Sequence, residues 1–350
     1  MFGRLLAATL LASLSAAPGA VAADAPLPSV SSASFASTPL ALSNGVKGTI
    51  ISFESHTPTD WAPAIRGEVG PAVALNAQLF LPARRTGKLP AIILVPGSGN
   101  IGTHHLAEAA ALNSAGYAVL LVDPFYARGI ADTIADQGRL TWVASTYDVL
   151  AAVRYLRSRS DIDPARIGAL GGSRGGTAVM MAAAAPFTKA VLGSDQGLRA
   201  VVAGYPWCGT QFQSARLSGG AALLVLQGDR DDWVSVQQCQ DAVHAMTVGG
   251  QAASMRIIPG ALHAFDRADV PPTQIPEAVT STIFPTIYMT DAGVYFDPRT
   301  GQADPALTVK DFTGYAAKAG FGRKGVTIGS RPGDADTFMG EMVAFFEKEL

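Results

Sequence analysis

A serine lies within a run of glycines in the sequence GALGGSRGGT, residues 168–177. Residues 171–175 match the pattern G-x-S-x-G with Ser173 at the centre, a weak match by itself in a chain with 37 glycines. The context is more specific, because the apolar run before it predicts a strand and GGTAVMMAAAA after it predicts a helix. A serine on such a sharp turn presents its hydroxyl at the carboxyl end of a sheet. We therefore predict that Ser173 is a nucleophile rather than part of an incidental turn.

A serine hydroxyl needs a neighbouring base to act as a nucleophile at neutral pH. The chain has five histidines, and His263 follows a predicted strand at residues 254–261, at the end of the sheet where Ser173 is expected. We predict that His263 is this base. The other histidines have different settings: His56 in an N-terminal loop, His104 and His105 at the start of a helix, and His244 inside an amphipathic helix. Adjacent histidines do not share a helix face well enough to indicate a metal pair.

A carboxylate that orients the base is expected between the serine and the histidine, again after a strand. The segment LLVLQGDRDDWVS offers Asp229, Asp231 and Asp232. Asp229 directly follows the strand and suits a turn, and Asp232 suits a surface or capping position. We favour Asp231, and the two neighbours remain alternatives.

An oxyanion that forms during acyl transfer needs preorganised donors. One is expected from the backbone N–H of Arg174, which follows the serine. The second is expected from the loop PGSGN, with Ser98 preferred and Gly99 as the alternative. For the Arg174 side chain we expect an ion pair with a loop acid, with contact to an anionic substrate as the alternative.

Apolar runs and amphipathic stretches alternate along most of the chain and indicate a mostly parallel sheet with helices on both faces, an α/β fold. Strands are predicted at residues 48–55, 72–82, 91–97, 117–124, 165–172, 199–206, 221–229 and 254–261. Helices are predicted at residues 105–115, 140–158, 175–185, 236–247 and 336–350. Residues 265–334 are rich in proline and aromatics with little regular period, and we predict an insertion there that wraps the substrate side.

The first 23 residues have one cation, Arg4, then an apolar core from Leu5 to Ala17 and small residues near its end. This pattern predicts a signal peptide, residues 1–23, followed by a leader at 24–45 and one domain at 46–350. The core is short for a membrane span, so we expect no stable membrane insertion after cleavage. The net charge is −2, and −3 once Arg4 is removed, with no long run of either sign. Nothing indicates nucleic-acid binding, and we expect a secreted or periplasmic protein.

Export changes how the two cysteines are interpreted, because disulfides persist in oxidising compartments. Cys208 and Cys239 admit one pairing. A disulfide closing a loop of this size stabilises a fold by about 3–4 kcal/mol in the chain-entropy model. We predict this disulfide, with two unrelated buried thiols as the alternative.

Ser173, Asp231 and His263 follow the chain order of the α/β hydrolases. Together with LVPGSG, LVDPFYARG, GGSRGG, GDRDDW and PGALHAFD, this order resembles the dienelactone hydrolase family over about residues 75–266. The resemblance implies an α/β-hydrolase fold, an ester or lactone substrate, and the roles proposed above for the three residues. The founding members of that family have a cysteine nucleophile, so Ser173 moves the expectation from a dienelactone towards other esters.

We therefore predict a secreted serine hydrolase that cleaves small-molecule carboxylic esters or lactones through an acyl-enzyme, without metal or organic cofactor. A serine peptidase or amidase of the same fold would use the same three residues and remains an alternative. A non-catalytic binding protein of this fold is the other. The sequence gives no prediction of oligomeric state.

Overall fold

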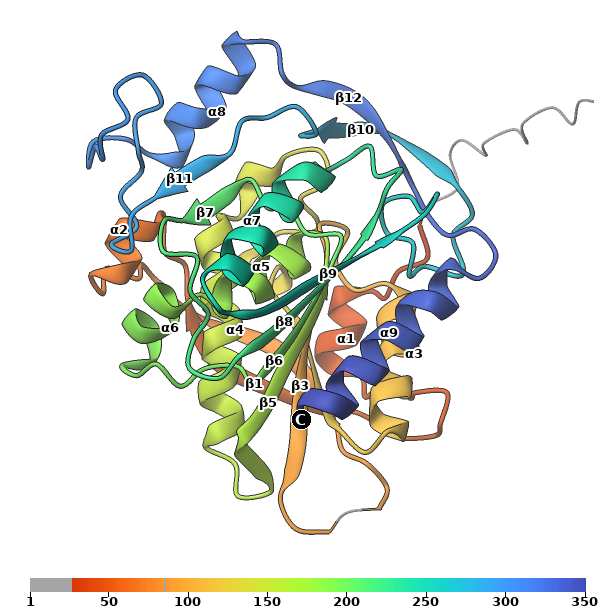
Figure 1. The fold of residues 1–350 in the computed structure, drawn as a ribbon. Coiled ribbons are helices and arrows are strands. Elements are labelled where there is room, and N and C mark those ends of the chain that lie inside the picture. Colours follow the sequence, from red (N-terminus) through yellow and green to blue (C-terminus); the bar gives the residue numbers. More distant parts are fainter. Residues whose placement is uncertain (1–26, 85) are drawn as a thin grey trace, which may run out of the picture.

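An eight-stranded sheet runs through the middle of the molecule (Figure 1). The computed structural model, which describes residues 27–84 and 86–350, gives the strand order β1-β2-β4-β3-β5-β6-β8-β9. Strands β4, β3, β5, β6, β8 and β9 are parallel, whereas β1 and β2 pair antiparallel at one edge. The strands are β1 (Thr49–His56), β2 (Ala72–Phe80), β3 (Leu89–Val95), β4 (Ala118–Asp123), β5 (Ile162–Gly172), β6 (Ala200–Gly204), β8 (Ala222–Gly228) and β9 (Ala252–Ile258).

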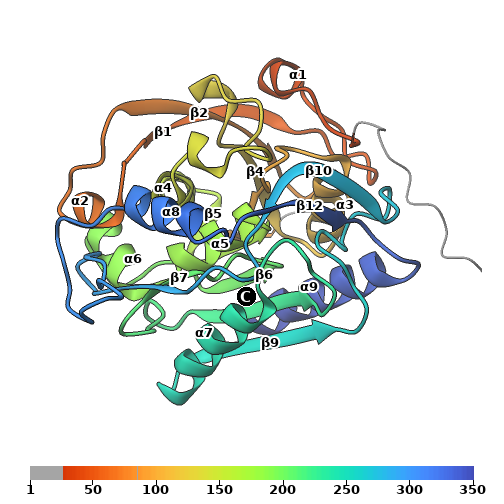
Figure 2. The same cartoon turned by 90° about the horizontal axis from the view of Figure 1, so that it is seen from above.

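Helices cover both faces of this sheet, as Figures 1 and 2 show. Helices α4 (Trp142–Arg157), α5 (Arg174–Ala182), α6 (Ala185–Leu192) and α7 (Val236–Val248) pack on one face. Helices α1 (Ser32–Ser37), α3 (Thr103–Ser114) and α9 (Asp334–Glu349) pack on the other. In β3, Ile93 belongs to the first core, while Ile92 and Leu94 belong to the second. Strands buried on both faces read as continuous apolar runs, which is why the alternation of strands and helices was visible in the sequence. The predicted α/β architecture is confirmed.

The part of the predicted leader that the structure describes lies against the sheet. Its short helix α1 buries Phe35 completely. Gln78, a fully buried polar residue in β2, donates from Nε2 to the carbonyls of Phe35 (2.7 Å) and Thr38 (2.9 Å) and accepts from Leu40 N (2.8 Å). A buried amide bonded in this way fixes the segment it contacts, because each unmade bond would leave a desolvated polar group. The predicted signal peptide, residues 1–23, lies outside the described residues.

Residues 265–334 contain more regular structure than their sequence indicated. Strands β10 (Thr273–Thr280) and β12 (Arg323–Ile328) form an antiparallel ribbon, and β11 (Ile287–Met289) pairs in parallel with β7 (Thr210–Phe212). Helix α8 (Val309–Lys318) lies between these strands in the sequence. The expectation of little regular structure here was wrong, because pairing partners such as Thr273 and Ile328 are distant in the sequence. The segment crosses the end of the sheet where the parallel strands finish (Figure 1).

Four helices were not predicted: α1, α6, α8 and α2 (Trp61–Ile65). Among the residues that the structure describes, no helix is both long and apolar enough to cross a membrane.

Candidate active site

Ser173 lies on the turn between β5 and α5, as the sequence predicted. Its φ of 54° and ψ of −119° are unusual for a residue with a side chain, and its N–H donates to Gly204 O at 2.8 Å. The glycines around it permit this turn: a Cβ on Gly175 would lie 2.2 Å from Val95 O, and one on Gly171 would lie 2.4 Å from the Gly175 carbonyl carbon. Side chains at these positions would separate helix from strand, so the glycine run is needed for close backbone approach rather than for flexibility.

His263 lies in the loop after β9 and meets the serine. Its Nε2 is 2.9 Å from Ser173 Oγ, and only 1% of the residue is exposed. The imidazole ring lies 4.8 Å, centroid to centroid, from each of the rings of Tyr205 and Trp233. This packing limits the ring to a narrow range of orientations, which a proton acceptor for the serine would require.

Asp231 is the acid that contacts the histidine. Its Oδ2 is 2.8 Å from His263 Nδ1 and accepts a second hydrogen bond from Gln227 Nε2 at 2.7 Å. Its Oδ1 accepts the backbone N–H groups of Trp233 (2.9 Å) and Val234 (3.0 Å). Four donors therefore fix the carboxylate, and a buried carboxylate needs such partners to remain charged. With this carboxylate on Nδ1, the histidine carries its proton there and leaves Nε2 free to accept one.

The two alternative acids have other partners. Asp229 Oδ1 accepts the N–H of Gly260. Asp232 Oδ1 accepts the N–H of Thr327, in β12, at 2.8 Å. The three sequence-predicted side chains, Ser173, Asp231 and His263, are thus the ones that the structure brings together.

None of the other four histidines is placed to accept the proton of Ser173 in the way that His263 is. His244 is exposed on α7, and the ring of His56, the last residue of β1, packs on Tyr147. His104 and His105 line the pocket beside the serine, with ring centroids 3.8 Å apart. Burial lowers the pKa of His104 well below its ordinary value and lowers the pKa of His105 to about 3. Both rings are therefore neutral at pH 7.

The main-chain groups expected to bind an oxyanion border the serine. Ser98 and Gly99 line the same small pocket as Ser173, and Arg174 begins α5. Within the described part of the chain, the N–H groups of Ser98, Gly99 and Arg174 donate to no protein acceptor. Unpaired amides at a helix start beside a reacting group are suited to bind negative charge.

The side chain of Arg174 does not form the expected ion pair. It is 2% exposed and donates to the carbonyls of Leu140 (2.9 Å) and Gln137 (2.6 Å), while its guanidinium lies 4.1 Å from the Trp142 ring centroid. Burial lowers its pKa to about 9. The expectation of an ion pair was wrong because the guanidinium contacts neutral oxygens and an aromatic face, which it also accepts. The nearby loop acid, Asp136, acts on it only through its charge, which opposes the lowering of the pKa.

A second buried polar group lies behind the histidine. Tyr205, whose ring packs on His263, donates its hydroxyl to Asp266 Oδ1 at 2.7 Å. Asp266 also shares a hydrogen bond with Glu108, and burial raises the pKa of Glu108 well above its ordinary value. Glu108 is therefore the protonated partner and donates to Asp266. The sequence analysis missed this group because its members come from three separate segments of the chain.

Gln227 was also missed, although the sequence carried a signal for it. It is the one polar side chain in the otherwise apolar strand ALLVLQG, two positions before the first candidate acid. A fully buried glutamine at a strand end needs a polar partner, and here that partner is Asp231.

The ribbon of β10 and β12 holds the loops that carry the base and the acid. The N–H of Gly329 donates to His263 O at 2.9 Å. On the other loop, Thr327 N donates to Asp232 Oδ1, and Thr280 Oγ1 donates to Asp232 O at 2.6 Å. The insertion therefore supports the geometry of the site as well as crossing over it.

Cys208 and Cys239 are joined by a disulfide, as predicted, with 5.0 Å between their Cα atoms. The bond connects the loop after β6 with α7, both next to the site.

A serine on a strained strand-to-helix turn, with an acid and a histidine after later strands of a mostly parallel sheet, is the arrangement of the α/β hydrolases. A dienelactone hydrolase-like promiscuous phosphotriesterase from metagenomic libraries has the same fold, with a TM-score of 0.53 over 87% of this chain and 99% of that one. The sequences are 14% identical, so this similarity concerns the fold.

The family model of the dienelactone hydrolases matches residues 75–282, and the chain belongs to the dienelactone hydrolase family. A Bradyrhizobium protein named as a probable 2-oxo-3-(5-oxofuran-2-ylidene)propanoate lactonase is 28% identical over 187 residues, 51% of this chain and 75% of that protein. YtaP of Bacillus subtilis (strain 168) is 32% identical over 121 residues, 29% of this chain and 40% of its own length. Family membership makes the protein a hydrolase.

Proposed function

We propose that the protein is an exported serine hydrolase that cleaves carboxylic esters or lactones through Ser173, His263 and Asp231. The observation that supports this most strongly is the chain of contacts from Ser173 Oγ to His263 Nε2 (2.9 Å) and from His263 Nδ1 to Asp231 Oδ2 (2.8 Å). These are the distances at which a base accepts a serine proton and a carboxylate orients the base.

In the first half of the reaction, Ser173 Oγ attacks the carbonyl carbon and its proton passes to His263 Nε2. The carbonyl π electrons move to oxygen, and the resulting oxyanion accepts hydrogen bonds from the backbone N–H groups of Arg174 and Ser98. The imidazolium is stabilised by Asp231. His263 then donates the proton to the departing alkoxide, which leaves an acyl-enzyme and a neutral alcohol.

In the second half, a water molecule occupies the position of the alcohol and gives a proton to His263 while it attacks the acyl carbon. Collapse of the second oxyanion breaks the bond to Ser173, and His263 returns the proton to Ser173 Oγ. For a lactone, the alcohol remains attached to the acid, and the product is a hydroxy acid.

Export is part of the proposal. Disulfides persist in oxidising compartments and are rare in the cytosol, so the bond between Cys208 and Cys239 supports a secreted or periplasmic protein. The predicted signal peptide provides a route to that compartment.

The test is hydrolysis of p-nitrophenyl acetate by the protein and by Ser173→Ala, together with labelling by a fluorophosphonate. We expect kcat to fall by at least about 10⁴-fold and labelling to disappear. Ser194→Ala, at an exposed serine, is the matched control and should change neither. Labelling that persists in Ser173→Ala, with the control intact, would overturn the assignment. Faster cleavage of the matching acetyl p-nitroanilide than of the ester would favour an amidase instead.

A further inference from the structure

A groove of about 890 Å³ opens next to the pocket that holds Ser173. The serine pocket itself has a volume of about 50 Å³. Six residues line both spaces, which places the two side by side: Leu27, Gly99, Asn100, Ile134, Arg267 and Ile275. A space of about 50 Å³ holds only a few non-hydrogen atoms, since one water requires roughly 10–15 Å³ on such a scale. Any substrate larger than a short ester must therefore extend into the groove.

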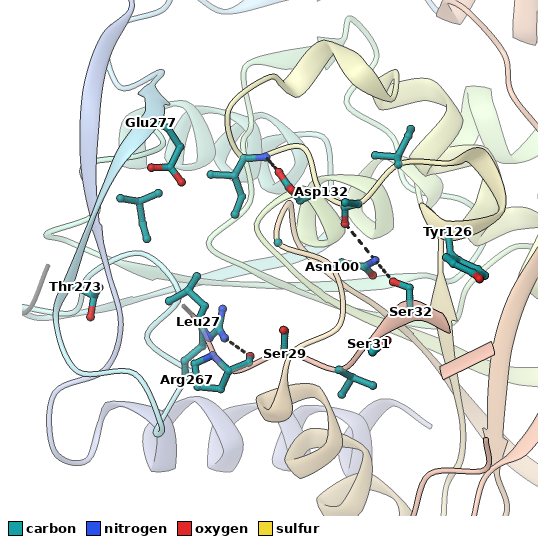
Figure 3. A pocket seen from close by; sticks show the side chains of 18 of the residues that line it. Leu27, Ser29, Ser31, Ser32, Asn100, Tyr126, Asp132, Arg267, Thr273 and Glu277 are labelled. Carbon is teal, nitrogen blue, oxygen red and sulfur yellow. Dashed lines mark hydrogen bonds between the residues drawn. The ribbon is translucent and has the colours of Figure 1, made fainter. Parts of the chain in front are cut away.

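Three stretches of chain form the walls of the groove: residues 27–33, residues 126–134, and residues 273–277 of β10. The first belongs to the predicted leader, and several hydrogen bonds hold it in place. Val30 N donates to Ile101 O at 2.8 Å, and Asn100 Nδ2 donates to the Oγ of Ser32 at 2.9 Å (Figure 3). Arg267 donates from Nη2 to Pro28 O at 2.9 Å. The N-terminal wall is thus bound to the loop after β3 that supplies the proposed oxyanion donors.

The lining chemistry identifies what the groove can hold. Five large aliphatic side chains line it: Leu27, Val30, Ile130, Ile134 and Ile275. Uncharged polar side chains lie among them: Ser29, Ser31, Ser32, Asn100, Tyr126, Thr273 and Gln274. The charged groups are the carboxylates of Asp132 and Glu277, which Figure 3 shows on the side opposite the N-terminal wall, and the guanidinium of Arg267. They sum to −1, two negative charges against one positive, so the groove gives an anionic group no net attraction. Aliphatic walls favour an uncharged apolar group by the area that it removes from water.

We propose that this groove binds the larger substituent of the ester, and that this substituent is extended, uncharged and mostly apolar. The inference rests on the proposed function, because it takes Ser173 as the reacting group. It assigns residues 27–33 to substrate selection, whereas sequence composition indicated only a leader over the domain surface.

Groove-filling variants test the proposal. Ala33, in the first turn of α1, and Ala131, on the opposite wall, are exposed alanines that line the groove. Tryptophan at either position fills part of the groove. Neither alanine is buried, so the replacement removes no side chain from the core. Ala190→Trp, at an exposed helical alanine of α6 outside the groove, is the matched control. Each protein is assayed for kcat/KM with two substrate pairs. p-Nitrophenyl acetate and octanoate vary the acyl group, and methyl and octyl acetate vary the alcohol.

We expect the unmodified protein to prefer the long member of at least one pair. In that pair, Ala33→Trp and Ala131→Trp should each lower kcat/KM for the long ester by about tenfold or more, because a few lost methylene contacts have that effect. Both should hydrolyse methyl acetate, which has only five non-hydrogen atoms and needs little of the groove, within about twofold of the unmodified protein. Ala190→Trp should do so with every substrate.

Two results overturn the proposal while leaving the proposed function intact. One is hydrolysis of p-nitrophenyl acetate that depends on Ser173, without preference for the long ester in either pair. The other is a preference that the groove variants change no more than Ala190→Trp does. Absence of Ser173-dependent hydrolysis with all four esters would instead refute the proposed function, and this inference with it.

Discussion

Replacement of Asp231 by asparagine tests the proposed mechanism most directly. The carboxylate accepts four hydrogen bonds, two on each oxygen. An asparagine that keeps its oxygen on the N–H groups of Trp233 and Val234 turns its NH₂ towards His263 Nδ1 and Gln227 Nε2. The asparagine NH₂ then faces His263 Nδ1, so Nδ1 must act as the acceptor and the imidazole proton moves to Nε2. A protonated Nε2 can no longer accept the proton of Ser173. The opposite orientation leaves two buried N–H groups facing an NH₂.

The expected loss in kcat is about 10⁴-fold, the size seen when serine proteases are given the wrong histidine tautomer by the same change. This corresponds to about 5.4 kcal/mol at 1.36 kcal/mol per tenfold. Stability should also fall, by about 1–3 kcal/mol for each donor left without an acceptor. Because both orientations of the amide lose hydrogen bonds, we expect no rearrangement that restores activity.

The assay is steady-state hydrolysis of p-nitrophenyl acetate, with urea unfolding of each protein to establish that it is folded. Asp232→Asn and Asp229→Asn are matched controls, since each removes one charge from the same loop and each can retain its backbone contact through the amide oxygen. Both should keep kcat within a few-fold. A folded Asp231→Asn protein with near-normal kcat, or a larger loss in either control, would refute the assignment of the acid.

Three further predictions concern stability, each measured by urea unfolding. Because burial raises the pKa of Glu108 above its ordinary value of 4.5, the folded protein keeps a proton that the unfolded chain releases, and stability from this group falls as pH rises above 4.5. Glu108→Gln should therefore gain stability relative to the unmodified protein as pH rises; a pH-independent difference would show that Glu108 titrates normally. Loss of the disulfide in Cys208→Ser/Cys239→Ser should cost about 3–4 kcal/mol, and dithiothreitol should lower only the unmodified protein to that level. An unchanged midpoint in the double variant would contradict this. Arg174→Lys cannot reproduce the fork of hydrogen bonds or the stacking, and should lose about 2–4 kcal/mol. A loss below 0.5 kcal/mol would show that the guanidinium contacts are dispensable.

Features set by local sequence could be predicted. The parallel strands are apolar because they are buried on both faces, so each is visible as a short run such as residues 91–95. The glycines around Ser173 are required by close contacts between neighbouring backbones, and this is why they mark the turn in the sequence. His263 could be located because it follows the last parallel strand, and all such strands end at the same edge of the sheet.

Features that depend on contacts between distant segments could not be predicted. Three aspartates lie within four residues, and although the sequence favoured Asp231, it could not exclude the other two. What separates them is the direction in which each side chain leaves the loop. One of those directions is set by Thr327, 95 residues further along the chain. The β10–β12 ribbon was missed for a similar reason, because its register shifts between Ile275 and Val279 and its sequence shows no regular alternation.

The contacts between the ribbon and the two loops have a consequence for the order in which the protein is completed during synthesis. The segments that hold His263 and Asp232 in place include Gly329 and Thr327, close to the C-terminal helix. A growing chain can therefore emerge with all eight strands of the sheet before the residues that hold the two loops exist. A chain that stops before residue 323 would contain the serine, the acid and the histidine but lack β12. The contacts that hold the two loops can therefore form only after the chain has been made past residue 329.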